Sequence, residues 1–238
     1  MLAPLLLAPL LSSGLQSGST NIDSYVQKGF RDVTFNAVIA KKNLTELRKI
    51  NPEFANTYLF DSILVRAKEP FKLRLEAAAD DTKATYIIDG MRQQFSVPRL
   101  GLRQTKDLSK YPGRRQTLLD FAIPTESLFD GFYTAKFVRF DRADGDPVFD
   151  LTFPKVFDDT SRQRVWIDKT QHIVTRREWY GQRGQLRAIF RYDVPKAING
   201  VVFPTQLTVY NSENKVAGVT RYSNVKVNQG LADSLFKL

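Results

Sequence analysis

The chain has 238 residues, of which 42% are hydrophobic and 12% aromatic, a composition typical of a globular domain and not of a disordered protein. It has no cysteine and one histidine, which excludes disulfides, thiolate nucleophiles, Cys-ligated zinc and multi-histidine metal sites. The formal net charge of +10 favours acidic partners, but Lys and Arg are spread along the chain without the dense basic run of a nucleic-acid-binding arm. We therefore expect no nucleic acid as a partner.

Residues 1–11 (MLAPLLLAPLL) form an apolar segment about as long as the hydrophobic region of a secretory signal peptide. The segment is too short to cross a bilayer, which takes roughly 20 apolar residues, and Pro4 and Pro9 argue against a buried strand. Small residues follow at Ser12-Ser13-Gly14, as at a cleavage site. We expect residues 1–19 to be a signal peptide and spacer, with the mature chain beginning near Leu15, and residues 20–238 to be one exported, periplasmic domain. It should neither span the membrane nor, since no cysteine follows the segment, carry a lipid anchor.

The first half of the domain mixes short helices with alternating strands. Asn21–Phe30 predicts a short amphipathic helix capped by Asn21 or Asp23, and Leu44–Ile50 predicts one or two helical turns that end at Asn51-Pro52. Val33–Ala40 alternates apolar and polar residues as a strand does. Four further strand segments follow, and the last two are joined by the turn Asp89-Gly90: Tyr58–Ala67, Phe71–Ala79, Thr85–Ile88 and Arg92–Val97.

The middle of the chain interrupts the β pattern. Arg99–Tyr111 is basic and without a clear period, so it predicts an exposed loop. Thr117–Phe132 predicts two short helical pieces separated by Pro124. Strands resume at Tyr133–Asp141 and Val148–Phe153.

The stretch from Ser161 to Asn228 predicts an antiparallel meander with one wet and one dry face. Its segments are rich in Val, Ile, Thr and aromatic residues and are separated by turn sequences: Arg162–Asp168, Ile173–Tyr180, Gln185–Asp193, Phe203–Tyr210 and Val216–Val227. The fold expected from the whole pattern is mainly β, with about 11–12 strands.

Several segments, taken in order, resemble the LolA-type lipoprotein carriers and the wider group of outer membrane lipoprotein-sorting proteins. They cover most of residues 21–238: Arg66–Glu76 (RAKEPFKLRLE), Asp89-Gly90, Val97-Pro98, Asp150–Lys155 (DLTFPK), Val165–Thr170 (VWIDKT), Tyr222–Asn228 (YSNVKVN) and Asp233–Phe236 (DSLF). The resemblance implies a curved, incomplete antiparallel β-barrel whose open mouth is covered by short α-helices. It also implies a carrier, or chaperone, that holds the acyl chains of a lipid or lipoprotein in an apolar cavity.

The resemblance and the strand pattern together indicate three groups of site residues. The cavity is expected to be lined by Phe60, Leu64, Phe71, Leu73, Leu75, Trp166 and Trp179, and the helical lid to consist of Leu118, Leu119, Phe121, Leu128 and Phe129. In the family an Arg stands directly before the Pro of the first motif and helps to latch the lid. Glu69 stands there in this chain, so either the latch has moved to Arg66, Lys68 or Arg74, or there is none. Ordinary core packing of the tryptophans and lid residues, and solvated edge charges in place of a latch, remain the alternatives.

A basic cluster next to the lid predicts docking on an anionic membrane surface or on the acidic face of a membrane transport complex. It consists of Arg99, Arg103, Lys106, Lys110, Arg114 and Arg115, and solubility alone is the alternative reading. No phosphate loop, Ser-centred elbow, metal motif or cofactor motif is present, so we expect no catalytic residue, no metal, no cofactor and no enzyme. Two other hypotheses stay open: a lipid- or peptide-sensing regulator on the same fold, and a secreted hydrolase using carboxylates of the concave face.

Overall fold

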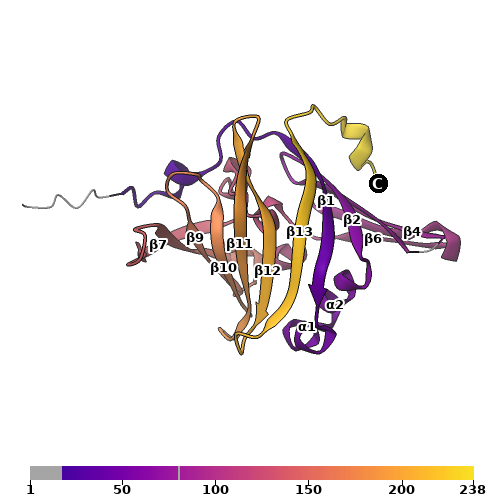
Figure 1. Ribbon diagram of the computed structural model, residues 1–238, viewed down its shortest axis with the longest axis horizontal. Coiled ribbons are helices and arrows are strands. Elements are labelled where there is room, and N and C mark those ends of the chain that lie inside the picture. The colour runs from indigo at the N-terminus through magenta and orange to yellow at the C-terminus, as the bar shows by residue number, and fades with distance from the viewer. Residues whose placement is uncertain (1–17, 80) are drawn as a thin grey trace, which may run out of the picture.

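The computed structural model in Figure 1 describes residues 18–79 and 81–238, so the expected signal peptide lies outside the described residues. About half of the described chain forms strands. They are β1 (Asp32–Lys42), β2 (Ser62–Lys68), β3 (Lys72–Ala79), β4 (Thr82–Asp89), β5 (Arg92–Val97), β6 (Leu102–Asp107), β7 (Thr134–Phe140), β8 (Pro147–Thr152), β9 (Arg162–Ile167), β10 (Val174–Tyr180), β11 (Leu186–Ile198), β12 (Val201–Asn211) and β13 (Val216–Val227). The five predicted strands of the meander are confirmed as β9 to β13.

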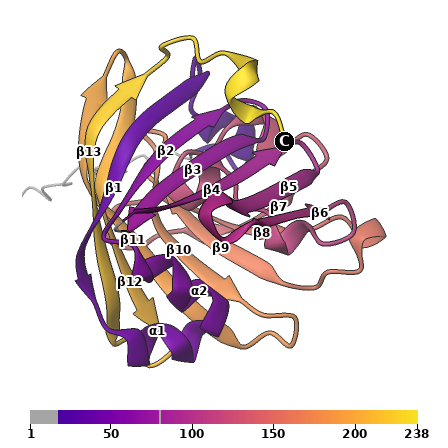
Figure 2. The same ribbon diagram turned by 90° about the vertical axis from the view of Figure 1, so that its right-hand side faces the viewer.

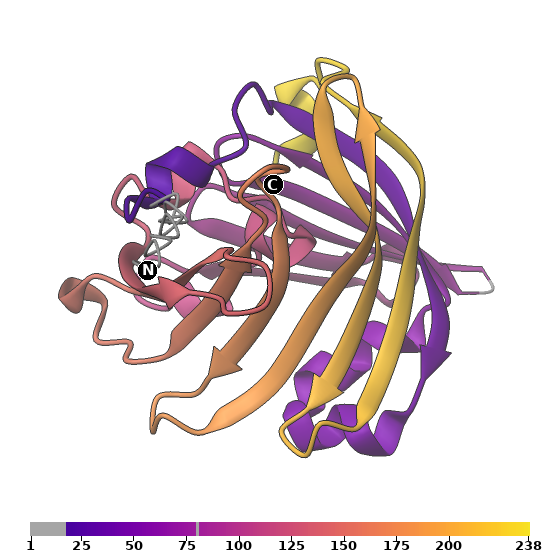
Figure 3. The same cartoon turned by 60° about the vertical axis from the view of Figure 1, so that its left-hand side comes forward.

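All strands belong to one antiparallel sheet in the order β6-β5-β4-β3-β2-β1-β13-β12-β11-β10-β9-β8-β7. The sheet curls around its concave side without closing, which confirms the predicted incomplete barrel (Figures 2 and 3). It has 13 strands because Leu102–Asp107, predicted as a loop, pairs with β5 as edge strand β6. Strand β6 shows no apolar–polar alternation in the sequence because almost all of its side chains are exposed and polar, as the open edge of a sheet allows.

The helical elements are short. The two α-helices are α1 (Leu44–Ile50) and α2 (Pro52–Asn56), and the 3₁₀ turns are η1 (Ile22–Tyr25), η2 (Thr57–Leu59), η3 (Pro98–Leu100), η4 (Pro112–Arg114), η5 (Leu118–Phe121), η6 (Glu126–Leu128), η7 (Lys155–Phe157) and η8 (Asp233–Phe236). The helix expected at Asn21–Phe30 is only the turn η1, although Asn21 does cap it by accepting from the Asp23 amide at 3.0 Å. The two pieces expected around Pro124 are the turns η5 and η6.

Helices α1 and α2 cover one end of the concave face (Figure 2). Leu47 and Ile50 of α1 are 0% and 2% exposed and belong to the apolar core. Tyr58 follows in η2 and lies against β13, where a Cβ on Gly218 would come within 2.5 Å of the Tyr58 ring. A glycine at this point of the strand therefore provides the space for that ring.

The concave side is filled by two clusters of buried apolar side chains. The first cluster, which includes Phe149, Val165 and Phe190, lies mainly along β8 to β12. The second cluster, which includes Phe35 and Phe203, lies along β1 to β4, β12 and β13. Burial of apolar surface at roughly 25 cal/mol per Å² makes these clusters the main source of stability.

Residues 229–238, which we call the C-terminal strap, lie against the outer face of β3 and β4. The Asp32 carboxylate accepts from the amides of Gln229, Gly230 and Leu231 at 2.8, 2.9 and 3.3 Å. Phe236, in η8, is fully buried. The strap therefore shields part of the convex face from water.

Candidate functional site

Residues 108–133, which we call the cover segment, connect β6 to β7. Because these two consecutive strands lie at opposite edges of the sheet, their connection has to cross the open side. Its side chains fill the interior: Leu119 and Leu128 (each 1% exposed) pack in the first cluster, and Leu118 (6%) and Ile123 (0%) pack in the second. Phe121 and Phe129 pack against the clusters from partly buried positions. The structure thus brings together all five residues expected to form the lid.

Backbone hydrogen bonds at three points tie the cover segment to the domain, and the first is donated by the Leu108 amide to the Met91 carbonyl at 2.7 Å. The carbonyl of Ala122 accepts from the Val174 amide on β10 at 2.9 Å, and the carbonyl of Pro124 accepts from the Gln27 amide at 2.7 Å. Beyond the three 3₁₀ turns η4, η5 and η6 the segment has little regular structure. It is held mainly by apolar packing, with a small number of polar contacts to the sheet and its turns.

The strongest polar contact of the cover segment is a buried ion pair with the sheet. Arg177 on β10 stands in register with Val165 and Phe190, so its side chain faces the interior, and the residue is only 7% exposed. Its Nη1 lies 2.9 Å from Asp120 Oδ1. The Tyr192 hydroxyl donates to the Asp120 carbonyl at 3.2 Å. Burial by itself would lower the pKa of Arg177, but Tyr192 and Asp120 beside it hold that pKa above its ordinary value.

Asp120 is also fixed within the cover segment itself. Its Oδ2 accepts from the Thr117 amide at 2.8 Å, and the Thr117 hydroxyl accepts from the Leu119 amide at 3.3 Å. This capping box holds the first turn of η5. The carboxylate therefore links the cover's local structure to the interior of the sheet.

Glu69, at the turn between β2 and β3, makes the second side-chain attachment. The Thr125 hydroxyl donates to Glu69 Oε1 at 2.9 Å. Burial raises the pKa of the Glu69 carboxyl, outweighing the hydrogen bonds from Ser127 and Thr125 that lower it. The residue in the position of the family's latch therefore does contact the cover, although it is an acid and not an arginine.

The three residues expected to form the latch face the other way. Arg66, Lys68 and Arg74 lie on the convex face, where Arg66 and Arg74 pair with Glu76. Lys68 Nζ donates to the Leu231 carbonyl at 2.7 Å and Arg74 Nη1 to the Leu235 carbonyl at 3.0 Å, so these two hold the C-terminal strap. Strand alternation gives each of them the face opposite to Val65 and Leu73, which agrees with the alternative of charges at the sheet surface in place of a latch.

The expected cavity residues divide between the two faces. Phe71, Leu73, Leu75 and Trp179 pack in the interior clusters or against them. Leu64, in register with Asn36 and Glu76, is on the convex face, and Phe60 is half-buried before β2 in neither cluster.

Trp166 also lies outside the interior. It is in register with Val148 and Arg176, its indole Nε1 donates to Asp141 at 2.9 Å, and the Arg176 guanidinium lies 4.6 Å from the centroid of the ring. Its neighbours Val165 and Ile167 take inward positions of β9. The two-residue period predicts that Trp166 points to the opposite side of the sheet from Val165 and Ile167. It does not predict which of the two sides is the interior.

Five of the six residues of the basic cluster are exposed, and one is not. Arg115 is 5% exposed, with its guanidinium 3.6 Å from the centroid of the Phe71 ring and 4.8 Å from that of Phe132. Burial lowers the pKa of Arg115 to about 10. Arg115 therefore fastens the cover to the interior by stacking on aromatic rings and is no docking residue. The exposed members are Arg99, Arg103, Lys106, Lys110 and Arg114.

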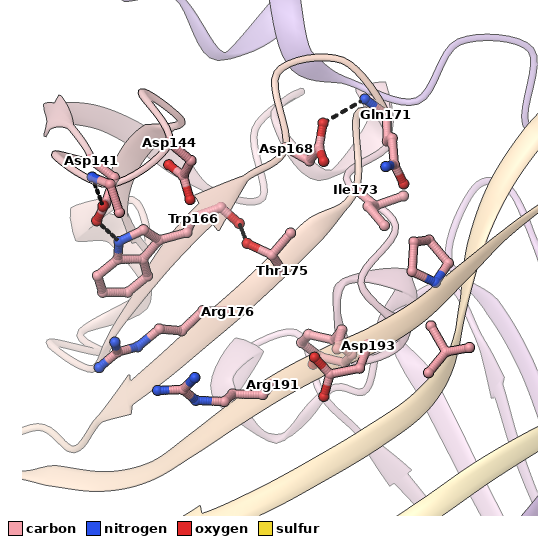
Figure 4. A pocket seen from close by; sticks show the side chains of 14 residues that line it. Asp141, Asp144, Trp166, Asp168, Gln171, Ile173, Thr175, Arg176, Arg191 and Asp193 are labelled. Atoms are coloured by element: carbon pink, nitrogen blue, oxygen red, sulfur yellow. Dashed lines mark hydrogen bonds between the residues drawn. The ribbon is translucent and has the colours of Figure 1, made fainter.

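Neither of two hollows in the described part of the chain has the character of the expected apolar cavity. The larger, of about 450 Å³, opens on the convex side where β10 and β11 diverge, and Figure 4 shows its charged lining. The lining carries both signs: Asp141, Asp144, Asp168, Asp193, Arg176 and Arg191. The smaller, of about 10 Å³, lies between the β2–β3 turn and the cover segment and is lined by Glu69, Phe71 and Leu128 among others. Side chains of the cover segment are part of both interior clusters.

Within residues 18–79 and 81–238, no three His, Cys, Asp or Glu side chains are grouped in a way that would hold a metal ion. In the same part of the chain no helix has the length and apolar character needed to cross a membrane.

Sequence reasoning missed Arg177, Asp120 and Tyr192. One signal was available for Arg177. It stands two residues before Trp179 on a predicted strand, so the two side chains share a face, and an inward Trp179 implies an inward charge at Arg177. A register shift between Val174 and Arg176 blurs that signal, because it brings both Val174 and Arg177 to the inner face.

An open, strongly curved antiparallel sheet, with its apolar concave face covered by a connection between its two edges, defines the structural class of this protein. The chain shares this fold with proteins of the LolA superfamily and the outer membrane lipoprotein-sorting group.

A LolA superfamily protein from Nitrosomonas europaea superposes with a TM-score of 0.58 at 16% sequence identity, over 90% of this chain and 94% of that one. A DUF1329 family protein from Desulfovibrio piger gives a TM-score of 0.55 at 15% identity, over 91% and 92%. A domain described as an outer membrane lipoprotein-sorting protein, from Vibrio parahaemolyticus, gives 0.52 at 14% identity, over 90% and 92%. At these identities the likeness is one of fold.

A family model whose description reads "-like: Uncharacterized protein" matches residues 126–238. No curated protein matches the chain.

Proposed function

We propose that this protein is a non-enzymatic carrier that binds the acyl chains of a lipid or lipoprotein on its concave face. The observation that carries the proposal is that the apolar interior is filled by a connection between the two sheet edges and not by the sheet alone. When the cover segment moves away, Leu119, Leu128 and their neighbours leave apolar space of the kind that an acyl chain can fill. Each CH₂ group buried there contributes about 0.8 kcal/mol.

The attachments of the cover suit such an exchange. Asp120–Arg177, Thr125–Glu69 and the stacked Arg115 are discrete contacts whose partners lie on the sheet or its turns. The cover residues and acyl chains are equally apolar, so replacing one by the other leaves the interior dry. Opening is therefore offset by binding of the cargo.

A cross-link of the cover tests the proposal, and the absence of native cysteine makes the experiment clean. In the Glu69→Cys/Thr125→Cys variant, oxidation pins the cover to the β2–β3 turn, where the two native side chains are in contact. We expect the reduced variant to bind a fluorescent fatty acid and the oxidised variant to lose that binding. The matched control is Asp150→Cys/Arg164→Cys, whose native side chains contact each other on the convex face. Equal binding by the cross-linked and reduced forms of Glu69→Cys/Thr125→Cys would contradict the proposal.

The proposal includes a location and a docking surface. A carrier of this kind works in the periplasm, and processing of residues 1–19 as a signal peptide is tested by N-terminal sequencing of the exported protein. Retention of Met1 on the exported product would contradict it.

Docking on an anionic membrane or a membrane complex is assigned to the exposed basic residues of β6 and the turns beside it. Each such residue contributes about 1 kcal/mol near an anionic surface, screened over roughly 8 Å at physiological salt. Changing Arg103, Lys106, Lys110 and Arg114 to Ser should weaken co-sedimentation with anionic vesicles at low salt. The control changes Arg183 and Arg187, which are exposed on another hairpin. Equal losses in the two variants would indicate a diffuse charge effect and no docking surface.

A further inference from the structure

We propose that the ligand of the concave face is an anionic amphiphile, and that its carboxylate or phosphate replaces the Asp120 carboxylate on Arg177. The inference rests on the proposed function, because it requires the cover segment to move. It adds the chemical class of the ligand and the residue that recognises its head group.

Arg177 is a cation in an apolar interior. Its register neighbours Val165 and Phe190 are buried, and its guanidinium lies 4.1 Å from the centroid of the Phe190 ring. A charge in such surroundings is strongly unfavourable unless an opposite charge accompanies it. Within the described chain, the ion-pair partner of Arg177 is Asp120, and Asp120 belongs to the cover and not to the sheet.

Movement of the cover therefore separates the pair. Asp120 already has a side chain that is 27% exposed and can move into water, whereas the Arg177 side chain is 8% exposed and remains fixed on β10. An open interior filled by a neutral chain leaves Arg177 without a counter-ion. A chain that carries its own anionic group restores the ion pair as the cover leaves.

The donors around Arg177 fit a carboxylate or phosphate. Arg177 Nε is buried and has no partner, although Nη1 is paired with Asp120. Two oxygens of an incoming anion can therefore be bound side by side by Nε and an Nη group, the geometry in which arginine recognises such anions. The Tyr192 hydroxyl, which now donates to the Asp120 carbonyl, becomes available as a further donor.

The convex cleft is a poorer place for such a group. Four carboxylates line it with Arg176 and Arg191, and Arg176 is already paired with Glu178. The repulsion from these carboxylates disfavours an anion there.

The test compares three amphiphiles with the same sixteen-carbon chain below their micelle concentrations: palmitate, lysophosphatidic acid and a neutral monoacylglycerol. We expect the folded wild-type protein to bind at least one of the two anions about tenfold or more tightly than the neutral compound. Preference for palmitate indicates a free fatty acid as ligand, and preference for lysophosphatidic acid indicates a phospholipid. Equal binding of all three would overturn the inference while leaving the carrier function intact, and binding of none would overturn both.

Two variants assign the preference to Arg177. Arg177→Met should reduce the affinity for the anions to that for the neutral compound, whereas Arg164→Met, on the convex face of the neighbouring strand, should change neither. Asp120→Asn should raise the affinity for all three by the same factor, because it removes the competing carboxylate but keeps the arginine. If Arg177→Met does not fold, Arg177→Lys provides the second measurement, since it should keep a reduced preference for anions. A preference that survives unchanged in Arg177→Met would overturn the inference.

Discussion

The concave and convex faces of this sheet use the same kind of ion pair in different surroundings. On the convex face, Asp150 accepts from Arg162 and Arg164 at 2.6 and 2.8 Å, and all three side chains are between 18% and 26% exposed. On the concave face, Arg177 has one ionic partner, Asp120, and is buried among apolar side chains. Loss of a partner outside is compensated by water, but loss of a partner inside is not.

The two faces also have different coverings. The convex face is covered in part by the C-terminal strap, which is held by Asp32, Lys68 and Arg74 through backbone groups. The concave face is covered by a segment that contributes apolar side chains to both clusters. The strap buries one large apolar side chain, Phe236, whereas the cover contributes apolar side chains to both interior clusters, so removal of the cover needs an apolar substitute.

The largest difference between the faces is expected for leucine truncation. Leu119→Ala removes a side chain that is 1% exposed and should lower the free energy of unfolding by about 3 kcal/mol. Leu64→Ala, at a half-buried position of the convex face, should lower it by about 1 kcal/mol. Urea denaturation measures both, and equal losses would mean that the cover does not contribute to the folded core.

The ion pairs should give the next largest difference. Asp120→Ala leaves Arg177 buried without a counter-ion and should lower the free energy of unfolding by about 2–3 kcal/mol, near the lower end for buried pairs because Asp120 is partly exposed. Asp150→Ala leaves two arginines that reach water and should cost about 1 kcal/mol. Thermal unfolding at low and high salt distinguishes them, since salt should screen the convex pair more than the pair made by the buried Arg177. A larger effect at Asp150 would reverse the comparison.

Two glutamates should respond to pH with opposite signs. Burial raises the pKa of Glu69, so its protonated form is favoured in the folded protein. Its contribution to stability is fully present below its unfolded pKa of 4.5 and is lost as the pH rises through the higher folded pKa. Glu69→Gln should therefore gain in Tm relative to the wild type as the pH is raised from 4 to 7.

Glu76, on the convex face, provides the contrast. Partial burial alone would raise the pKa of Glu76, but hydrogen bonds and charge from Arg74 and Arg66 hold it below its ordinary value. Its contribution is present above its unfolded pKa of 4.5 and is lost as the pH falls through the lower folded value. Glu76→Gln should thus be less stable than the wild type at pH 7, with the difference disappearing in acid. If the stability of both variants relative to the wild type changed in the same direction between pH 4 and pH 7, the two carboxyl groups would not have the surroundings described here.

The smallest effect is expected for Lys68→Ala. The residue binds the Leu231 carbonyl and Asp233 of the C-terminal strap from a position that is 25% exposed, so its loss should cost less than about 1 kcal/mol. Fatty-acid binding should be unchanged, because Lys68 lies on the convex face. A large loss of binding, measured by probe displacement, would return Lys68 to the role of a latch.

Much of the fold can be predicted from the sequence because the two-residue alternation of a strand involves only neighbouring residues. The five strands between residues 161 and 228, the helical turn at Leu44–Ile50 and the two turns around Pro124 are confirmed where the pattern placed them. The apolar residues of Thr117–Phe132 also indicated a covering segment, since a run of leucines on no strand has to be buried somewhere. Hydrophobic spacing and turn residues act over a few positions, and sequence reasoning captures them.

Only the tertiary structure decided which side of each strand faces inward and which polar groups meet there. Trp166, Leu64 and Lys68 are on the convex face because a period of two separates two faces without saying which is covered. Arg115 is buried because Phe71 and Phe132, far from each other in the sequence, form the surfaces on which it stacks. Asp120 and Arg177 are 57 positions apart in the numbering and meet only because the connection between the two sheet edges must cross the concave side. Such contacts depend on the path of the chain as a whole, and no local pattern of residues encodes them.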